Sequence, residues 1–285
     1  MDTQALLDNV STISNDTVTT NAKEFLKALK FVVTATSKYH TRPILRYVHV
    51  RIDENELILE STDSHQLTQF KMAAEVDKKL VGKEFLIDSK FARKLSKTPT
   101  KHGENIIITP EYDEDGLRTG LVKYADGNHE LFIDDHDGFE GHYPDLDICI
   151  PDRSDYSFDV QTKELLPVLK ELKKFTNAKD GNVVHLEIQD NSGVVIGVDG
   201  DDSSIQEIKQ KNLFIDEKHI VENNKGLNFE INFNLKYLIG LVQKCDSTEF
   251  LHFSFSGTLR PFTFTRENGG IGLVCPIRTF DKKKF

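Results

Sequence analysis

The two halves of this chain repeat one plan of helix and strands, and that duplication restricts the folds open to it. Residues 21–37 and residues 161–175 each carry apolar side chains at the spacing of one buried helix face. Lys23 and Lys163, near the starts of these segments, are 140 positions apart. Each predicted helix precedes runs that alternate between polar and apolar residues, as paired strands do. We therefore expect an α+β protein made of one duplicated domain, each copy with two helices packed on antiparallel sheets.

Turn and capping residues set the boundaries of the other expected elements. Asp88-Ser89 and Asn234 are good helix N-caps, and Pro99 ends the helix that begins after Ser89. Pro167 lacks a backbone N–H, so we expect it to limit or bend the first turns of its helix. The further expected elements are two strands within 46–60 joined by a turn at 53–55, strands 62–74, 105–109, 117–123, 183–188, 194–198 and 227–233, and helices 90–98 and 234–245.

Composition is that of a globular protein with two cores. The chain has 285 residues, 38% hydrophobic content and 19 Phe, which is enough apolar material for two domains. It has no run approaching the roughly 18 apolar residues of a membrane helix, and its first residues carry neither the basic start nor the hydrophobic core that a signal peptide would have. Cys149, Cys245 and Cys275 are widely spaced, which indicates reduced thiols rather than disulfides or a zinc site. We expect a soluble, cytoplasmic protein with no membrane partner.

The charges of the chain are unevenly distributed. Thirty-six basic and 46 acidic residues give a net charge of −10, which by itself speaks against a nucleic-acid partner. Four predicted helices nevertheless carry basic residues at helical spacing. If these helices line one wall, that wall suits sequence-independent contact with phosphates, whereas for any single helix a solvated face is the alternative. The candidate DNA-facing residues are Lys23, Lys27, Lys30, Lys90, Arg93, Lys94, Lys97, Lys163, Lys170, Lys174, Lys236 and Lys244.

Signatures of catalysis are missing from the sequence. There is no nucleotide-binding glycine loop and no serine elbow. His136 and His142 lie among acidic residues at 134–140, but their spacing matches no metal motif, and an acidic solvated loop explains them better. We therefore expect a binding protein rather than an enzyme, without cofactor or metal.

A polar turn in the first half and the end of the second half resemble one known family. STDSHQL at 61–67 follows a strand with Leu57 and Leu59 on one face, which predicts a tight strand-to-strand turn. With YVHV at 47–50 before it, this stretch resembles the middle domain of the bacterial DNA polymerase III β subunit, the replicative sliding clamp. Gln66 stands where that family usually has arginine. GLVCPIR at 272–278 is similar to the hydrophobic-Met-Pro-Met-Arg ending of the same family.

The resemblance extends over residues 18–278 and corresponds to the middle and last domains of the family only. YPDL at 143–146 and the following Ile150-Pro151 are similar to the end of the family's middle domain. We therefore expect a flexible lead-in over residues 1–15, a middle-type domain over 16–152 and a last-type domain over 153–285.

This resemblance implies a fold, a function and partners. Sliding clamps enclose duplex DNA with six similar domains, helices inward, and bind DNA polymerase and clamp loader through short peptides laid between the middle and last domains. It implies the DNA clamp fold, a role as a polymerase processivity factor and, with two domains per chain, a homotrimeric ring. A non-encircling decoy or regulator that captures clamp-binding peptides is the alternative. The implied peptide-site residues are Leu45, Thr62, Ser64, His65, Gln66, Leu67, Pro151, Asn234, Tyr237, Pro261, Leu273, Val274, Cys275, Pro276, Ile277 and Arg278.

Overall fold

A computed structural model of the chain describes ten stretches that together hold most of the expected elements. The predicted lead-in, the loop with His136 and the residues after Arg278 lie outside them. The described residues are 16–39, 41–100, 103–111, 119–124, 130–132, 142–189, 193–198, 213–215, 220–223 and 229–278.

The chain divides into two compact units that are not simple halves of the sequence. The first unit comprises Met1–Val33, Tyr39–Leu59 and Lys71–His142, and the second comprises Thr34–Lys38, Glu60–Phe70 and Tyr143–Phe285. The second unit thus takes in residues 60–70, which include the polar turn at 61–67. The sequence predicts a domain boundary at Asp152, a few residues beyond Tyr143, where the last segment of the second unit begins.

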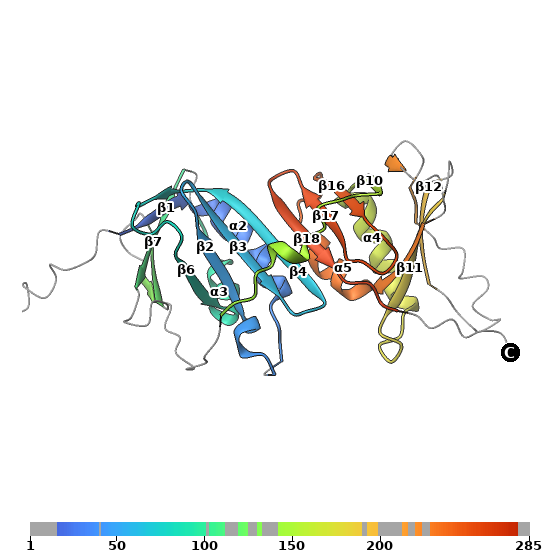
Figure 1. The fold of residues 1–285 in the computed structure, drawn as a ribbon, viewed down its shortest axis with the longest axis horizontal. Helices are drawn as coiled ribbons and strands as arrows, with labels where there is room; N and C mark the ends of the chain where they lie inside the picture. The colour runs from blue at the N-terminus through green and yellow to red at the C-terminus, as the bar shows by residue number, and fades with distance from the viewer. Residues whose placement is uncertain are drawn as a thin grey trace, which may run out of the picture. The chain divides into compact units, whose positions relative to one another are not determined.

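The first repeat of the fold holds helices α2 and α3 and strands β1 to β9 (Figure 1). Its helices are α2, Ala22–Val32, and α3, Ser89–Leu95, with 3-10 helices at Val33–Ala35 and Pro43–Arg46. Its strands are β1 Val18–Asn21, β2 Tyr47–Ile52, β3 Glu56–Thr62, β4 Gln66–Ala73, β5 Glu75–Val76, β6 Glu84–Asp88, β7 Asn105–Glu111, β8 Thr119–Tyr124 and β9 Glu130–Phe132.

The second repeat holds helices α4 and α5 and strands β10 to β18. Its helices are α4, Thr162–Leu172, and α5, Leu235–Val242, with 3-10 helices at Asp147–Cys149 and Lys173–Phe175. Its strands are β10 Tyr156–Gln161, β11 Val183–Gln189, β12 Gly193–Gly197, β13 Leu213–Ile215, β14 Ile220–Asn223, β15 Phe229–Asn234, β16 Phe250–Phe255, β17 Phe262–Arg266 and β18 Gly270–Val274.

Strand order shows that the two repeats share one topology. The neighbours β5-β1-β7-β8-β9 of the first repeat recur as β14-β10-β16-β17-β18 in the second, and β4-β3-β2-β6 recur as β13-β12-β11-β15. In both repeats a strand leads directly into the first helix, and another leads into the second. Figure 1 shows each pair of helices alongside the strands of its own repeat. The predicted α+β fold, with two helices and antiparallel sheets in each copy, is confirmed.

Within the described stretches, side-chain caps explain where α2, α3 and α5 begin. The Asn21 side chain accepts a hydrogen bond from Glu24 N at 3.1 Å, ahead of α2. Asp88 accepts from the first turn of α3, as predicted, and Asn234 accepts from Lys236 N at 2.9 Å, ahead of α5. Each cap satisfies an N–H that has no partner within its helix.

The helix ends and several strands differ from the sequence-based expectation. The segments predicted as helical to residues 37 and 175 leave the α-helix at Val32 and Leu172 and each finish with a 3-10 turn. α4 nevertheless runs past Pro167 as one helix. The strands that the sequence did not predict are β1, β5, β6, β9, β10, β13, β14, β16, β17 and β18.

A cluster of phenylalanines forms the core of the second unit. Phe158 of β10 stacks on Phe253 of β16 with ring centroids 5.0 Å apart, and Phe255 stacks on Phe262 of β17 at 5.2 Å. All four side chains are buried. Their area and stacking make this cluster a major source of stability for the unit.

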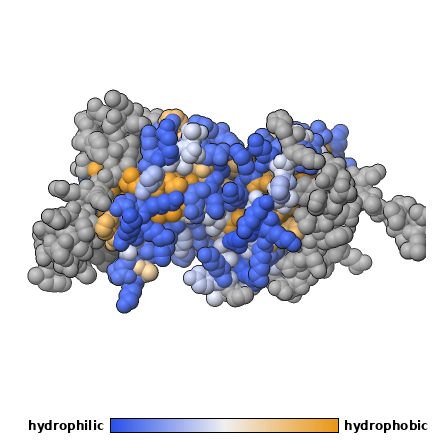
Figure 2. Space-filling model, turned by 180° about the vertical axis from the view of Figure 1, so that it is seen from behind, coloured by the Kyte–Doolittle hydropathy of each residue, from blue (hydrophilic) through white to orange (hydrophobic). Residues whose placement is uncertain are grey.

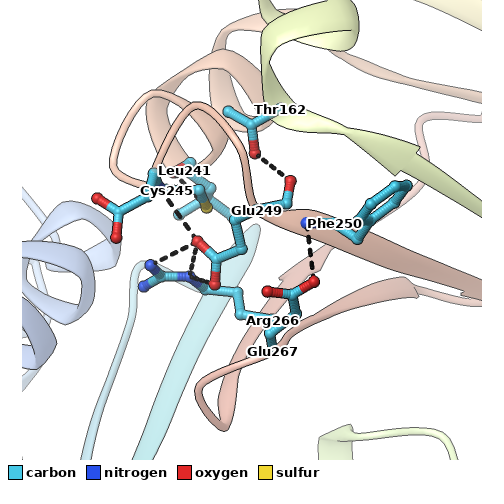
Figure 3. Close-up of polar contacts among 8 residues, drawn as sticks. Thr162, Leu241, Cys245, Glu249, Phe250, Arg266 and Glu267 are labelled. Carbon is cyan, nitrogen blue, oxygen red and sulfur yellow. Dashed lines mark hydrogen bonds and ion pairs between the residues drawn. The ribbon is translucent and has the colours of Figure 1, made fainter.

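A buried ion pair joins the start of β16 to the end of β17 in the same unit (Figure 3). Arg266 Nη2 lies 3.0 Å from Glu249 Oε2, and both side chains are at most 5% exposed. Glu249 also accepts from Asp246 N, and its carbonyl accepts from Thr162 N at the start of α4. Burial raises the pKa of the neighbouring Cys245 thiol to about 12. Glu249 therefore connects the start of α4 and the loop after α5 with the sheet.

Candidate functional site

The polar turn after β3 is a tight turn closed by its own side chains. Thr62 Oγ1 donates to the Gln66 carbonyl at 2.7 Å and accepts from Ser64 N at 3.0 Å. Asp63 Oδ1 accepts from His65 N and Gln66 N at 2.9 and 3.0 Å. Ser64 has a φ of 77°, in the left-handed region that few side chains adopt. The predicted strand-to-strand turn is therefore confirmed, with Ser64 and His65 exposed at its tip.

Strand pairing brings this turn to the end of the described chain. β4 and β18 are antiparallel, with Gln66 opposite Val274 and Leu67 opposite Leu273. Beyond the strand, Cys275 N donates to the His65 carbonyl at 2.8 Å. The two stretches that carry the family resemblance, far apart in the sequence, therefore lie side by side in the second unit.

The start of α5 is the third component of the same site. The imidazole of His65 stacks on the ring of Tyr237, with centroids 6.0 Å apart and an angle of 11° between the rings. Pro276 forms a bridge with Phe233, and Ile277 N donates to the Asn232 carbonyl at 2.7 Å. The segment after β18 is thus held between the turn and the strand that leads into α5.

The predicted site residues fall into three groups by burial. Pro261 directly precedes β17, whose first residue pairs with Val274. Leu45 belongs to the first unit, where it is buried in a 3-10 helix. Leu45, Thr62, Gln66, Leu67, Leu273 and Val274 are buried, Pro151, Asn234, Tyr237, Pro261, Cys275, Pro276 and Ile277 are half-buried, and Ser64, His65 and Arg278 are exposed.

A polar contact that sequence reasoning missed ties the hairpin to the segment before β10. Gln69 Nε2 donates to Glu60 Oε2 at 3.0 Å and to Asp147 Oδ1 at 2.7 Å. Asp147 begins the 3-10 helix that precedes Pro151. Burial also raises the pKa of Tyr143. The sequence signal that could have indicated the Gln69 contact was a glutamine at a buried strand position, because a buried amide requires polar partners.

Two glycines of β18 were also missed, and each lies beneath a phenylalanine. A Cβ on Gly272 would lie 2.4 Å from the ring of Phe264, its cross-strand partner. A Cβ on Gly270 would lie 3.0 Å from the ring of Phe70, its partner on β4. These close approaches require glycine, and the paired phenylalanines fix the register of β18 on both sides.

The candidate DNA-facing lysines occupy matching places in the two repeats. Lys23 and Lys163 are the second residues of α2 and α4, and Lys90 and Lys236 are the second residues of α3 and α5. Lys30 and Lys170 are both ninth in their helices and, like these four, are exposed. Lys27, Lys94, Lys97 and Lys174 are exposed as well, and Lys244 is half-buried. Figure 2 shows one face on which hydrophilic residues dominate the described part.

Arg93 differs from the lysines of this set. It is half-buried, and its guanidinium donates to the carbonyls of Ser89 at 3.2 Å and Val33 at 3.0 Å. Burial lowers the pKa of Arg93. Its role here is to join α3 to the end of α2, so it has less freedom to contact a ligand than the lysines have.

Two classes of site have no support in the part of the chain that the structure describes. No group of three or more His, Cys, Asp or Glu residues is placed there to hold a metal ion. None of the described helices is long and apolar enough to cross a membrane. All three cysteines are free thiols.

Comparison with known proteins points to one family. Residues 19–130 match the model of the DNA polymerase III beta subunit, central domain. The beta sliding clamp of Staphylococcus aureus is 26% identical over 261 residues, which are 90% of this chain and 63% of the relative. That of Staphylococcus epidermidis is 24% identical over the same length. This chain therefore spans less than two thirds of the length of these relatives.

Solved structures agree on the fold. The DNA polymerase sliding clamp of Bacillus subtilis matches with a TM-score of 0.75 at 24% identity, covering 94% of this chain and 66% of that one. A sliding clamp of Pseudomonas aeruginosa matches with a TM-score of 0.76 at 14% identity, covering 93% and 66%. The duplicated topology and these matches define a protein of the DNA clamp fold. The chain is similar to DNA polymerase III beta subunits, and its residues 19–130 match the model of their central domain.

Proposed function

We propose that this chain is a sliding-clamp-like DNA polymerase processivity factor of the cytoplasm, which encircles duplex DNA and binds partner peptides. The proposed peptide site, called the β4–β18 site below, consists of the turn at 61–67, the segment 275–278 after β18 and the start of α5. The observation that carries the proposal is the meeting of the polar turn, the segment after β18 and the start of α5 in one unit. A non-catalytic role is consistent with the family.

The chemistry of the β4–β18 site suits a short peptide with apolar anchors. Half-buried Tyr237, Pro276 and Ile277 offer apolar surface, which receives leucine and phenylalanine side chains. Exposed His65 and Arg278 supply polar groups that can orient a peptide amide or backbone. The proposed partners are DNA polymerase and clamp loader, each through a segment of the Gln-x-x-Leu-Phe type.

A peptide of that type is expected to bind at one site, and His65→Ala and Pro276→Ala should each weaken binding about tenfold, as truncation of a central contact does. Fluorescence anisotropy with a labelled peptide measures the affinity. His252→Ala, which changes a histidine of the same unit paired with Asp159, is the control and should leave the affinity unchanged. Unchanged affinity in both site variants would show that the peptide site has been assigned wrongly.

The exposed lysines of the helices are the proposed contact with DNA. Their matching places in the two repeats favour a common task over independent solvation, since the chain as a whole is acidic. Contacts of this kind neutralise phosphates without reading bases, as a protein that moves along DNA requires.

Replacing Lys27, Lys94 and Lys170 together by glutamate should weaken DNA binding and lower the salt slope of log K by about 3, one unit for each lost phosphate contact. Binding measured over a range of salt concentrations tests this. The matched control replaces Lys71, Lys78 and Lys83, which are also exposed but lie outside the helices. Equal slopes for the two triple variants would show that the helix lysines are ordinary solvated side chains that do not contact DNA.

A homotrimeric ring is the proposed assembly. Three copies of this two-repeat chain would supply the six repeats that the resemblance implies for a ring around DNA. Such rings close by head-to-tail contacts between copies. The edge strands of the sheets are suited to such pairing between copies. A protein that binds clamp peptides but is not retained on DNA would instead fit the decoy or regulator.

A further inference from the structure

A buried glutamine on β4 holds two carboxylates from different parts of the second unit. Gln69 is 2% exposed, and Glu60 of the adjacent strand β3 is 1% exposed. Gln69 Nε2 donates to Glu60 Oε2 at 3.0 Å and to Asp147 Oδ1 at 2.7 Å. Both hydrogens of one amide nitrogen are therefore engaged, each by a carboxylate. Hydrogen bonds to charged acceptors are stronger than those between neutral groups, so the Gln69 side chain is firmly held.

The bond to Asp147 fixes the segment 143–151, called the connector below. Tyr143 at its start is buried, and the Tyr143 hydroxyl makes a hydrogen bond with the backbone of Thr62 on β3. Asp147 begins the 3-10 helix of the connector, and Ile150 N donates to the Asp147 carbonyl at 3.2 Å. The connector is therefore attached to the β3–β4 hairpin at two points, Tyr143 and Asp147, and the second of these depends on Gln69.

The sheet face that Gln69 shares with the connector also carries predicted peptide-site residues. Side chains two positions apart on a strand point to one face, and directly opposed residues of an antiparallel pair share that face. Leu67 therefore lies on the face of Gln69, and Leu273, which is opposite Leu67, lies there too. Burial raises the pKa of the Cys275 thiol, and the nearby Cys149 of the connector adds to that rise. The connector thus extends from Gln69 towards the segment after β18.

We propose that Gln69 is a positioning residue of the β4–β18 site, which through Asp147 holds the connector as a wall of that site and keeps Pro151 in place for a partner peptide. The inference rests on the proposed peptide-binding function. Gln69 itself does not contact the peptide, because its side chain is buried and both of its donors are engaged. Without its bond to Asp147 the connector adopts other conformations, and a peptide binds only the fraction of molecules in which the wall is formed.

Two substitutions of Asp147 test this role in the full chain. Asp147→Ala removes the acceptor, whereas Asp147→Asn keeps an oxygen that can accept from Gln69 Nε2. Anisotropy with a labelled Gln-x-x-Leu-Phe peptide should show about tenfold weaker binding for Asp147→Ala, the loss expected for a hydrogen bond to a charged group. Asp147→Asn should lose about threefold or less, because a neutral bond remains. Asp152→Ala removes the same charge from an exposed position directly after the connector, and it should leave the affinity unchanged.

Hydrogen exchange separates positioning from a general loss of stability. The amides of Cys149 and Ile150 donate within the connector, to the carbonyls of Leu146 and Asp147. Exchange of these amides should be about tenfold faster in Asp147→Ala and in Gln69→Leu, which removes both donors. Amides of β16 and β17, in the core of the same unit, should keep their wild-type protection in Asp147→Ala. Combining the two substitutions should weaken peptide binding no further than the weaker single variant, because both break one bond.

The outcomes separate this inference from the function on which it rests. Wild-type affinity in Asp147→Ala, or an equal loss in Asp147→Ala and Asp152→Ala, would overturn the role of Gln69 and leave peptide binding intact. Faster exchange throughout β16 and β17 in Asp147→Ala would also overturn it, because the effect would then be a general loss of stability. Failure of the peptide to bind the wild-type chain would overturn the proposed function, and this inference with it.

Discussion

Arg266→Ala is expected to lower the free energy of unfolding by about 3–5 kcal/mol, because it leaves the buried carboxylate of Glu249 without its partner. Arg266 Nε also donates to Glu249 Oε1 at 3.2 Å, so the contact is bidentate. The guanidinium lies over the ring of Phe70 on β4, 5.8 Å from its centroid. Loss of the side chain should therefore loosen β18 against β4 and weaken peptide binding as well.

Urea denaturation followed by circular dichroism measures this effect, since the chain has no tryptophan. Glu249→Leu combined with Arg266→Met removes both charges and should cost less than Arg266→Ala alone. Lys174→Ala breaks the exposed pair with Glu171 and should cost roughly 0–1 kcal/mol. If Arg266→Ala cost no more than Lys174→Ala, the buried pair would not have the structural role assigned to it.

The helices could be predicted from sequence because their signals are local. Amphipathic spacing identifies α2 and α4, and the caps Asp88 and Asn234 place the starts of α3 and α5. The ends of α2 and α4 were placed too late, because the 3-10 turns that follow continue the apolar spacing. Local signals therefore identify a helix more securely than they fix its last turn.

Several strands of the second repeat were harder to predict from the sequence, because their pairing partners lie far away in the chain. β10 is a strand through its pairing with β14 and β16, and β16 continues that sheet to β17. One signal was available: in FTFTR, the period of two puts Arg266 on the same buried face as Phe262 and Phe264. A buried arginine requires an acid, and Glu249 could have been sought on that ground.

The candidate site shows the same limit. The turn at 62–67 was predicted from its own residues, but its position beside residues 272–278 came only from the family resemblance. No local pattern shows that Gly272 lies beneath Phe264 or that Gln69 meets two carboxylates, because both depend on pairing between strands. The orientation of the Gln66 amide likewise depends on the fold of the turn around Asp63.

Encirclement is expected to have the largest effect on how long the protein is retained on DNA. A closed ring on DNA without free ends cannot leave when its contacts with the DNA dissociate. Protein incubated with a linear duplex carrying biotin at both ends would thread over those ends. Streptavidin added afterwards would trap it, and it should survive a high-salt wash that removes contacts made only to phosphates. Cleavage of the duplex between the blocks should then release it.

The most direct measurement is therefore retention on end-blocked DNA after a high-salt wash, compared for two orders of addition. We predict strong retention when the protein is added before streptavidin, and almost none when it is added after. The lysine triple variant should weaken initial binding, yet any molecules that are trapped should remain trapped. Equal loss in the wash for both orders of addition, with peptide binding intact, would contradict encirclement and favour the decoy or regulator.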